Sequence, residues 1–109
     1  MSAARQKGTA AETAVVRFLR ANGYQHAERR ALAGSQDRGD VAGVGGVVIE
    51  VKNCKRMELA AWIDEAEDEA NGTEIAAVWH KRVGRGDPGD WYVTMSGYDF
   101  LNAIGKWTR

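Results

Sequence analysis

Two acids and one base lie within a single β-prone segment, residues 39–52 (GDVAGVGGVVIEVK): Asp40, Glu50 and Lys52. Charged side chains among small and β-branched strand residues are costly unless something binds them. Neighbouring carboxylates suit a Mg²⁺-like cation, which proteins usually hold with one or two carboxylates plus phosphate oxygens and waters. Such a cation lowers the pKa of a bound water, and a nearby Lys orients that water or stabilises charge developing on a phosphate. The set indicates phosphodiester hydrolysis.

The two acids can share a cation only if adjacent strands present them on one face. A hairpin with the three-residue loop Val44-Gly45-Gly46 pairs Asp40 directly with Glu50, because side chains alternate faces along a strand. One face then carries Asp40, Ala42, Val48, Glu50 and Lys52, and the other is wholly apolar, with Val41, Val47, Ile49 and Val51. A two-residue Gly45-Gly46 loop would instead put Asp40 opposite Val51 and separate the acids. We favour the longer loop because it gives one clean apolar face and one clean polar face. The alternative is a surface hairpin with ordinary solvent-facing charges.

A helix upstream of the hairpin brings a third acid. Thr9 and Glu12 have the spacing of a capping box, so we expect a helix over about 10–22 that follows a flexible basic arm at residues 1–7. Its apolar stripe consists of Ala11, Val15, Phe18 and Leu19. Glu12 lies beside this stripe, and it either caps the helix or leans toward the cation as a third carboxylate.

The remaining pattern predicts an α/β domain. Strands are expected over 24–30, 75–80 and 91–95, and helices over about 58–71 and from Ser96 or Gly97 onward. The order α-β-β-β-α-β-β-α indicates one domain over 1–109, with a mixed central β-sheet flanked by helices. The second helix carries a run of acids that we expect to form a solvated outer face pointing away from any nucleic acid, because they would repel a phosphate backbone: Asp64, Glu65, Glu67, Asp68 and Glu69.

Composition restricts the cellular compartment and the class of binding partner. The sequence has no apolar run that could cross a bilayer and no secretory signal, and its single Cys54 excludes an internal disulfide, so a cytoplasmic protein is expected. The net charge is zero, but residues 1–56 carry +5 and residues 57–109 carry −5. This asymmetry indicates that a polyanion faces the basic part. The loop at 31–38, which contains Ser35 and Arg38, either lies on a phosphate backbone or only connects two strands.

In this context the chain resembles the PD-(D/E)xK nuclease superfamily, and most of all the archaeal-type Holliday junction resolvases and their phage relatives. The resemblance covers most of the chain, including KGTAAE at 7–12, the Ser35 loop, GD at 39–40, IEVKN at 49–53 and the strand AAVWHK. It implies a restriction-endonuclease-like core, a Mg²⁺ cofactor for which Mn²⁺ can substitute, branched or four-way DNA as substrate, and a homodimer. If this protein is encoded by a phage, the expected compartment is the cytoplasm of the host cell.

The resemblance also assigns roles to residues. It implies a catalytic Lys52, metal ligation by Asp40, Glu50 and the Val51 carbonyl, a helix-one acid at Glu12, and a loop serine near the scissile phosphate at Ser35. Its DNA surface would comprise Arg5, Lys7, Arg29, Arg30, Arg38, Lys55 and Arg56. Two alternatives stay open: another nuclease of the superfamily that acts on duplex DNA, and a non-catalytic DNA-binding module with the same fold.

Overall fold

Three α-helices and five strands follow one another in the predicted order. The computed structural model describes residues 2–30 and 39–107. Its elements are α1 (Ala3–Ala21), β1 (Glu28–Arg29), β2 (Val41–Ala42), β3 (Val47–Lys52), α2 (Leu59–Ala70), β4 (Ile75–His80), the short 3₁₀ helix η1 (Pro88–Asp90), β5 (Tyr92–Thr94) and α3 (Gly97–Trp107). The loop at 31–38, with Ser35 and Arg38, lies outside the described residues.

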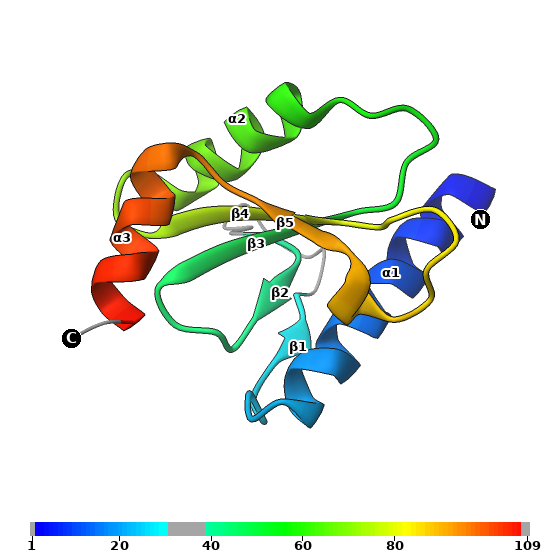
Figure 1. Ribbon diagram of the computed structural model, residues 1–109. Coiled ribbons are helices and arrows are strands. Elements are labelled where there is room, and N and C mark those ends of the chain that lie inside the picture. Colours follow the sequence, from blue (N-terminus) through cyan, green and yellow to red (C-terminus); the bar gives the residue numbers. More distant parts are fainter. Residues whose placement is uncertain (1, 31–38, 108–109) are drawn as a thin grey trace.

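The strands form one mixed sheet in the order β1-β2-β3-β4-β5. Only β3 and β4 are parallel, and each other neighbouring pair is antiparallel. A parallel pair needs a crossover connection, and α2 provides it between β3 and β4. The helices α1 and α2 pack on opposite faces of the sheet (Figure 1). The expected mixed sheet flanked by helices is thereby confirmed.

Each sheet face has its own apolar core. Ile49 and Val51 of β3 point toward α1, where Val15 is fully buried. Val48 of the same strand points the other way, toward Trp62 and Ala66 of α2. The face that was expected to be polar is therefore half covered by a helix. Within residues 2–30 and 39–107, no helix is both long and apolar enough to cross a membrane.

The start of α1 corrects two expectations. The helix begins at Ala3 with Ser2 as its N-cap, because the Ser2 hydroxyl accepts a hydrogen bond from the Arg5 backbone N–H at 3.1 Å. Residues 3–7 are thus helical rather than a flexible arm, as their good helix propensity allows. Thr9 and Glu12 lie inside the helix, so the capping-box interpretation is wrong.

The hairpin register agrees with the sequence prediction. Val41 pairs with Ile49, which centres the connection on Gly45 as predicted, and the Asp40 N–H just before β2 also bonds the Ile49 carbonyl. The connection is longer than predicted, because β2 stops at Ala42 and residues 43–46 form the turn. Similarly, the strand expected over 24–30 is only Glu28–Arg29, since a turn closed by the Ala27 N–H and the Tyr24 carbonyl occupies its first half.

Two glycines of the turn offer a matched test of this packing. Gly43 has φ +92°, and an added Cβ would lie 2.0 Å from the His26 carbonyl oxygen. Gly45 has open space around an added Cβ and no positive φ. We expect Gly43→Ala to lower the free energy of unfolding by more than about 2 kcal/mol. Gly45→Ala should change it by less than about 0.5 kcal/mol. Thermal and denaturant unfolding would measure both, and equal effects would contradict the close packing of the turn on His26.

Candidate active site

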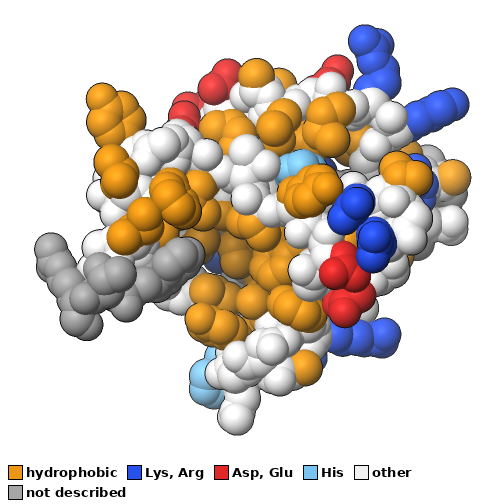
Figure 2. Space-filling model, in the orientation of Figure 1, with side chains coloured by type: hydrophobic (Ala, Val, Ile, Leu, Met, Phe, Trp, Pro, Cys, Tyr) orange, Lys and Arg blue, Asp and Glu red, His pale blue; other side chains and the backbone are white. Residues whose placement is uncertain are grey.

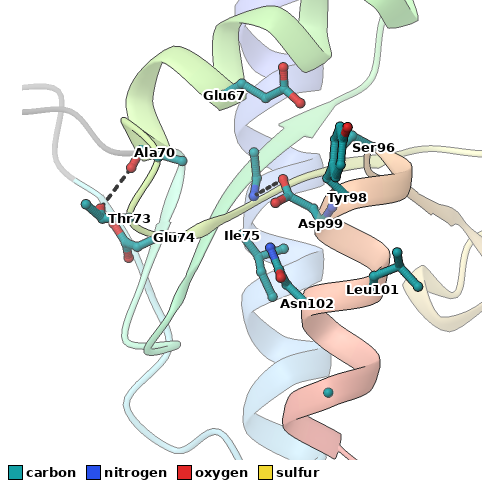
Figure 3. Close-up of a pocket in the computed structure, with 13 residues that line it drawn as sticks. Glu67, Ala70, Thr73, Glu74, Ile75, Ser96, Tyr98, Asp99, Leu101 and Asn102 are labelled. Carbon is teal, nitrogen blue, oxygen red and sulfur yellow. Dashed lines mark hydrogen bonds between the residues drawn. The ribbon is translucent and has the colours of Figure 1, made fainter.

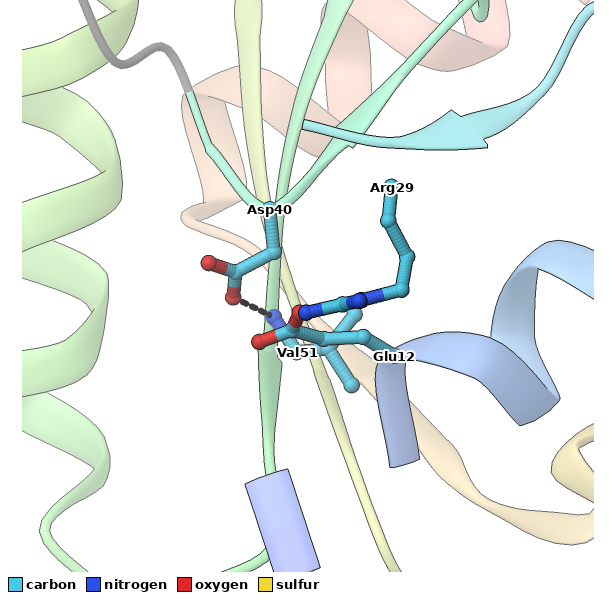
Figure 4. A network of polar contacts seen from close by, with 4 residues as sticks. All are labelled: Glu12, Arg29, Asp40 and Val51. Atoms are coloured by element: carbon cyan, nitrogen blue, oxygen red, sulfur yellow. Dashed lines mark hydrogen bonds and ion pairs between the residues drawn. The ribbon is translucent and has the colours of Figure 1, made fainter. Parts of the chain in front are cut away.

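Asp40 stands where the backbone ladder between β2 and β3 ends. Its N–H donates to the Ile49 carbonyl, and its Oδ2 accepts from the Val51 N–H, each at 2.7 Å. The carboxylate therefore takes the place of a backbone acceptor, while its other oxygen points away from Val51 (Figure 4). Gly39 permits this approach, because a Cβ there would lie 2.7 Å from the Ile49 oxygen. Asp40 is thus fixed beside β3 by a short, well-defined contact.

Glu12 reaches the same point from α1. Figure 4 shows its carboxylate and that of Asp40 on the same side of Val51. Burial and the charge of Asp40 raise the pKa of Glu12, and a 3.1 Å ion pair with Arg29 of β1 partly offsets this rise. The expected third carboxylate is therefore present next to Asp40. Arg29 compensates the charge of Glu12 only in part and is itself exposed.

Glu50 is buried between β3 and α2, with only 4% of its surface exposed. Burial raises its pKa to about 10, helped by a hydrogen bond with the Glu69 carboxyl group and by the charges of Asp40, Glu69 and Glu65. Without a cation the group holds a proton at neutral pH. The alternative of a solvent-facing hairpin is wrong for this residue, because α2 covers its face of the sheet.

Lys52 is held by an acid of α2. Its Nζ lies 2.9 Å from Glu65 Oε1. Burial acts to lower the pKa of Lys52, but the bond to Glu65 and the charges of Glu50 and Asp40 outweigh it, so the net shift is upward. The side chain is therefore a positioned ammonium group, suited to orienting an anion or a water rather than to removing a proton.

Sequence reasoning missed the part played by α2. Its acids were expected to form a solvated face turned away from any nucleic acid, yet Glu65 and Glu69 meet Lys52 and Glu50. A usable signal was present, because these two acids are four residues apart and flank the buried Trp62 and Ala66 on the helix. One oxygen of Glu69 is buried without a hydrogen-bond partner, which marks this cluster as incompletely neutralised.

The acids are chemically suited to a divalent cation. Within the part of the chain that the structure describes, no group of three or more His, Cys, Asp or Glu side chains is already arranged around a metal position. Mg²⁺ seldom needs such a cage, since one or two carboxylates and several waters suffice. The charge of Asp40 raises the cost of ionising both Glu12 and Glu50, and a cation would reverse that cost. We conclude that the donor set fits a Mg²⁺-like ion.

Basic residues gather at the end of the molecule where α1 begins (Figure 2). Arg5 and Lys7 are exposed on the first turns of α1, and Lys55 and Arg56 are exposed between β3 and α2. Arg30 is half-buried, with its backbone N–H bonded to the Asp40 carbonyl. The expectations for Ser35 and Arg38 lie outside the described residues.

A separate open pocket lies away from these acids. It has a volume of about 670 Å³ and lies between the end of α2, the start of β4 and α3 (Figure 3). Since β3 and β4 are parallel, the acids and Lys52 lie at the carboxyl ends of these strands, and the cavity lies at the amino end of β4, near Ile75. There the Asp99 carboxylate accepts a hydrogen bond from the Ala76 N–H at 3.1 Å, which docks α3 on β4.

The chain was compared with protein-family models, with curated proteins and with solved structures. No family model, no curated protein and no solved structure matches it. The candidate site therefore has to be judged on its own residues and geometry.

The raised pKa of Glu50 gives a first test, on the metal-free protein. The folded state holds a proton that the unfolded chain releases near pH 4.5, so the free energy of unfolding should fall as pH rises from about 4.5 toward 10. Glu50→Gln should remove this fall and stabilise the protein by more than about 2 kcal/mol at pH 8. Denaturant unfolding between pH 5 and 9 with a chelator would measure this. The matched control is Glu67→Gln, on the exposed side of α2, and equal pH slopes in the two variants would contradict the buried-acid assignment.

Proposed function

We propose that the protein is a metal-dependent DNA endonuclease with a restriction-endonuclease-like active site, and that it nicks branched DNA such as a four-way junction. The observation that carries the proposal is the buried Glu50. It lies on β3, near enough to Asp40 for the charge of Asp40 to raise its pKa, and two residues before a positioned Lys52. A buried acid among other acids is costly in the folded protein, and a site that must bind a cation explains why the sequence keeps it.

Asp40 and Glu50 are the expected ligands of Mg²⁺, together with the Val51 carbonyl. In a strand the N–H and C=O of one residue point to the same edge. The Val51 N–H bonds Asp40, while the Lys52 carbonyl faces β4 and accepts from the Lys81 N–H. The Val51 carbonyl therefore points to the Asp40 side. When bound there, the ion supplies an acidified water and charge stabilisation on the phosphate.

Side chains of the protein position the attacking water and the phosphate. The Lys52 ammonium, anchored by Glu65, orients the attacking water and offsets negative charge on the phosphate. Glu12 lies beside Asp40, where it could hold a water near a bound ion, and Arg29 partly compensates its charge.

Exposed cations on the elements next to this site support a DNA substrate. They are Arg5 and Lys7 on α1, and Lys55 and Arg56 after β3. The acids of α2 were expected to repel DNA. Some of them face inward instead of toward solvent, so they oppose DNA binding less than the sequence suggested. The preference for branched over linear DNA follows from the resemblance to junction resolvases.

A nicking assay tests the chemistry. Glu50→Gln and Lys52→Ala should each lower Mg²⁺-dependent nicking of a four-way junction by at least about a thousandfold, because each removes a group that acts at the phosphate. Asp68→Asn, an exposed change on α2, should keep full activity. Full nicking by both site variants would end the proposal. Equal cleavage of linear duplex would favour a duplex nuclease, and junction binding without any cleavage would favour a non-catalytic module.

Glu65 should matter through Lys52. Glu65→Gln keeps a hydrogen-bond acceptor but removes the charge that holds the ammonium, so we expect kcat to fall by about tenfold with KM for the junction nearly unchanged. Single-turnover kinetics with Asp68→Asn as control would measure this. A change confined to KM would show that Glu65 acts on DNA binding instead.

A homodimer is also proposed, with α3 as its surface. Tyr98, Phe100 and Leu101 are 86%, 50% and 66% exposed, and such a patch on a folded domain commonly marks an association site. Leu101→Glu should convert a dimer into a monomer in sedimentation velocity experiments. Unchanged sedimentation of the variant would remove α3 from the interface, and a monomeric wild-type protein would remove the dimer.

A further inference from the structure

The connection between β4 and β5, residues 81–91, begins beside the candidate catalytic lysine. The Lys81 N–H donates to the Lys52 carbonyl at 2.9 Å, so this loop continues directly from the site. Its three Gly and one Pro are typical of a turn. Its position at the carboxyl ends of β3 and β4 means that DNA seated at Lys52 would lie within reach of the loop.

Two indole side chains hold this loop in one conformation. The Trp91 Nε1–H donates to the Arg85 carbonyl at 2.8 Å, and the Trp79 Nε1–H donates to the Pro88 carbonyl at 3.1 Å. A turn closes the tip, where the Arg85 N–H donates to the Arg82 carbonyl at 3.1 Å and Gly84 has φ +80°. The loop is therefore ordered by internal contacts.

The cations of the loop are placed on aromatic rings. The Lys81 Nζ lies 5.8 Å from the centroid of the Trp91 ring, and the Arg82 guanidinium lies 5.5 Å from that of Tyr92. Asp87, an acid of the same loop, is engaged in capping η1 through the Gly89 N–H. With Arg85 and a second acid, Asp90, the loop carries three cations and two acids, so its net charge next to the site is +1.

Val83 stands out at the tip. It is 97% exposed and lies between Arg82 and Gly84 in the turn. A fully exposed aliphatic side chain on an ordered loop adds nothing to the core. Proteins that open or bend DNA use apolar side chains of this kind as wedges between bases, flanked by cations on the phosphates.

We propose that this loop recognises the branch point of the DNA, a proposal that rests on the proposed nuclease function. Val83 packs against unstacked bases, and the flanking phosphates are contacted by Lys81, Arg82 and Arg85. Base pairs at a branch point lack one stacking neighbour, so a wedge enters there at lower cost than within a continuous duplex. Val83 would then determine the preference for branched over linear DNA.

The test compares junction and duplex binding in chelator, where no cleavage occurs. The wild-type protein should bind a four-way junction more tightly than a linear duplex, and it should raise the fluorescence of 2-aminopurine placed at the branch point. Val83→Ala and the isosteric Val83→Thr should weaken junction binding by about tenfold and leave duplex binding unchanged. Val93→Ala, a similar deletion on β5 at a 45% exposed position, is the matched control and should bind like wild type.

Arg82→Ala should act differently, by weakening junction and duplex binding alike and lowering the salt dependence of both. If the Val83 variants keep the wild-type ratio of junction to duplex affinity while the protein still nicks junctions, the wedge is refuted and the nuclease function stands. If the wild-type protein binds and cleaves no DNA, both proposals fail. Because Val83 is exposed, its variants should unfold at the wild-type temperature, which excludes loss of fold as the cause.

Discussion

The structure depends on how it accommodates one buried acid. The Glu50 carboxyl lies between β3 and α2, close to Asp40 and in contact with Glu69. A carboxylate in such surroundings must either take up a proton or meet a cation, since burial without compensation is costly. The other polar contacts of the site follow from this constraint. Lys52 is close enough to stabilise the acids but is itself bound to Glu65, so it does not fully neutralise Glu50.

The fold builds this situation through one connection. A parallel β3–β4 pair requires a crossover, and the crossover lays α2 over the polar residues at the end of β3. On the other face, α1 brings Glu12 to Asp40, with Arg29 from β1 as its counter-ion. Acids from three separate parts of the chain therefore meet around the carboxyl end of β3. At the same end, the β4–β5 loop and the start of α1 carry exposed cations (Figure 2), and a polyanion could approach there.

Much of this architecture was predictable from local patterns. The apolar spacing along α2 and the apolar run at 75–79 gave elements whose bounds differ little from those in the structure. The alternation in 39–52 gave the register of the hairpin. The wrong prediction of the first helix start also came from a local sequence pattern. A capping-box spacing at Thr9 concealed the better N-cap at Ser2, because helix-forming residues continued the helix in the N-terminal direction.

The sequence by itself determined the hairpin register that pairs Val41 with Ile49, because strand alternation and glycines around position 45 leave only one register with a continuous apolar face. Tertiary structure alone decided that Glu50 is buried and that Glu65 and Glu69 join the site. The physical reason is that strand periodicity says which side chains share a face but not what covers that face. The crossover helix supplies the cover, and with it the surroundings that turn two strand acids into a site requiring a cation or a proton.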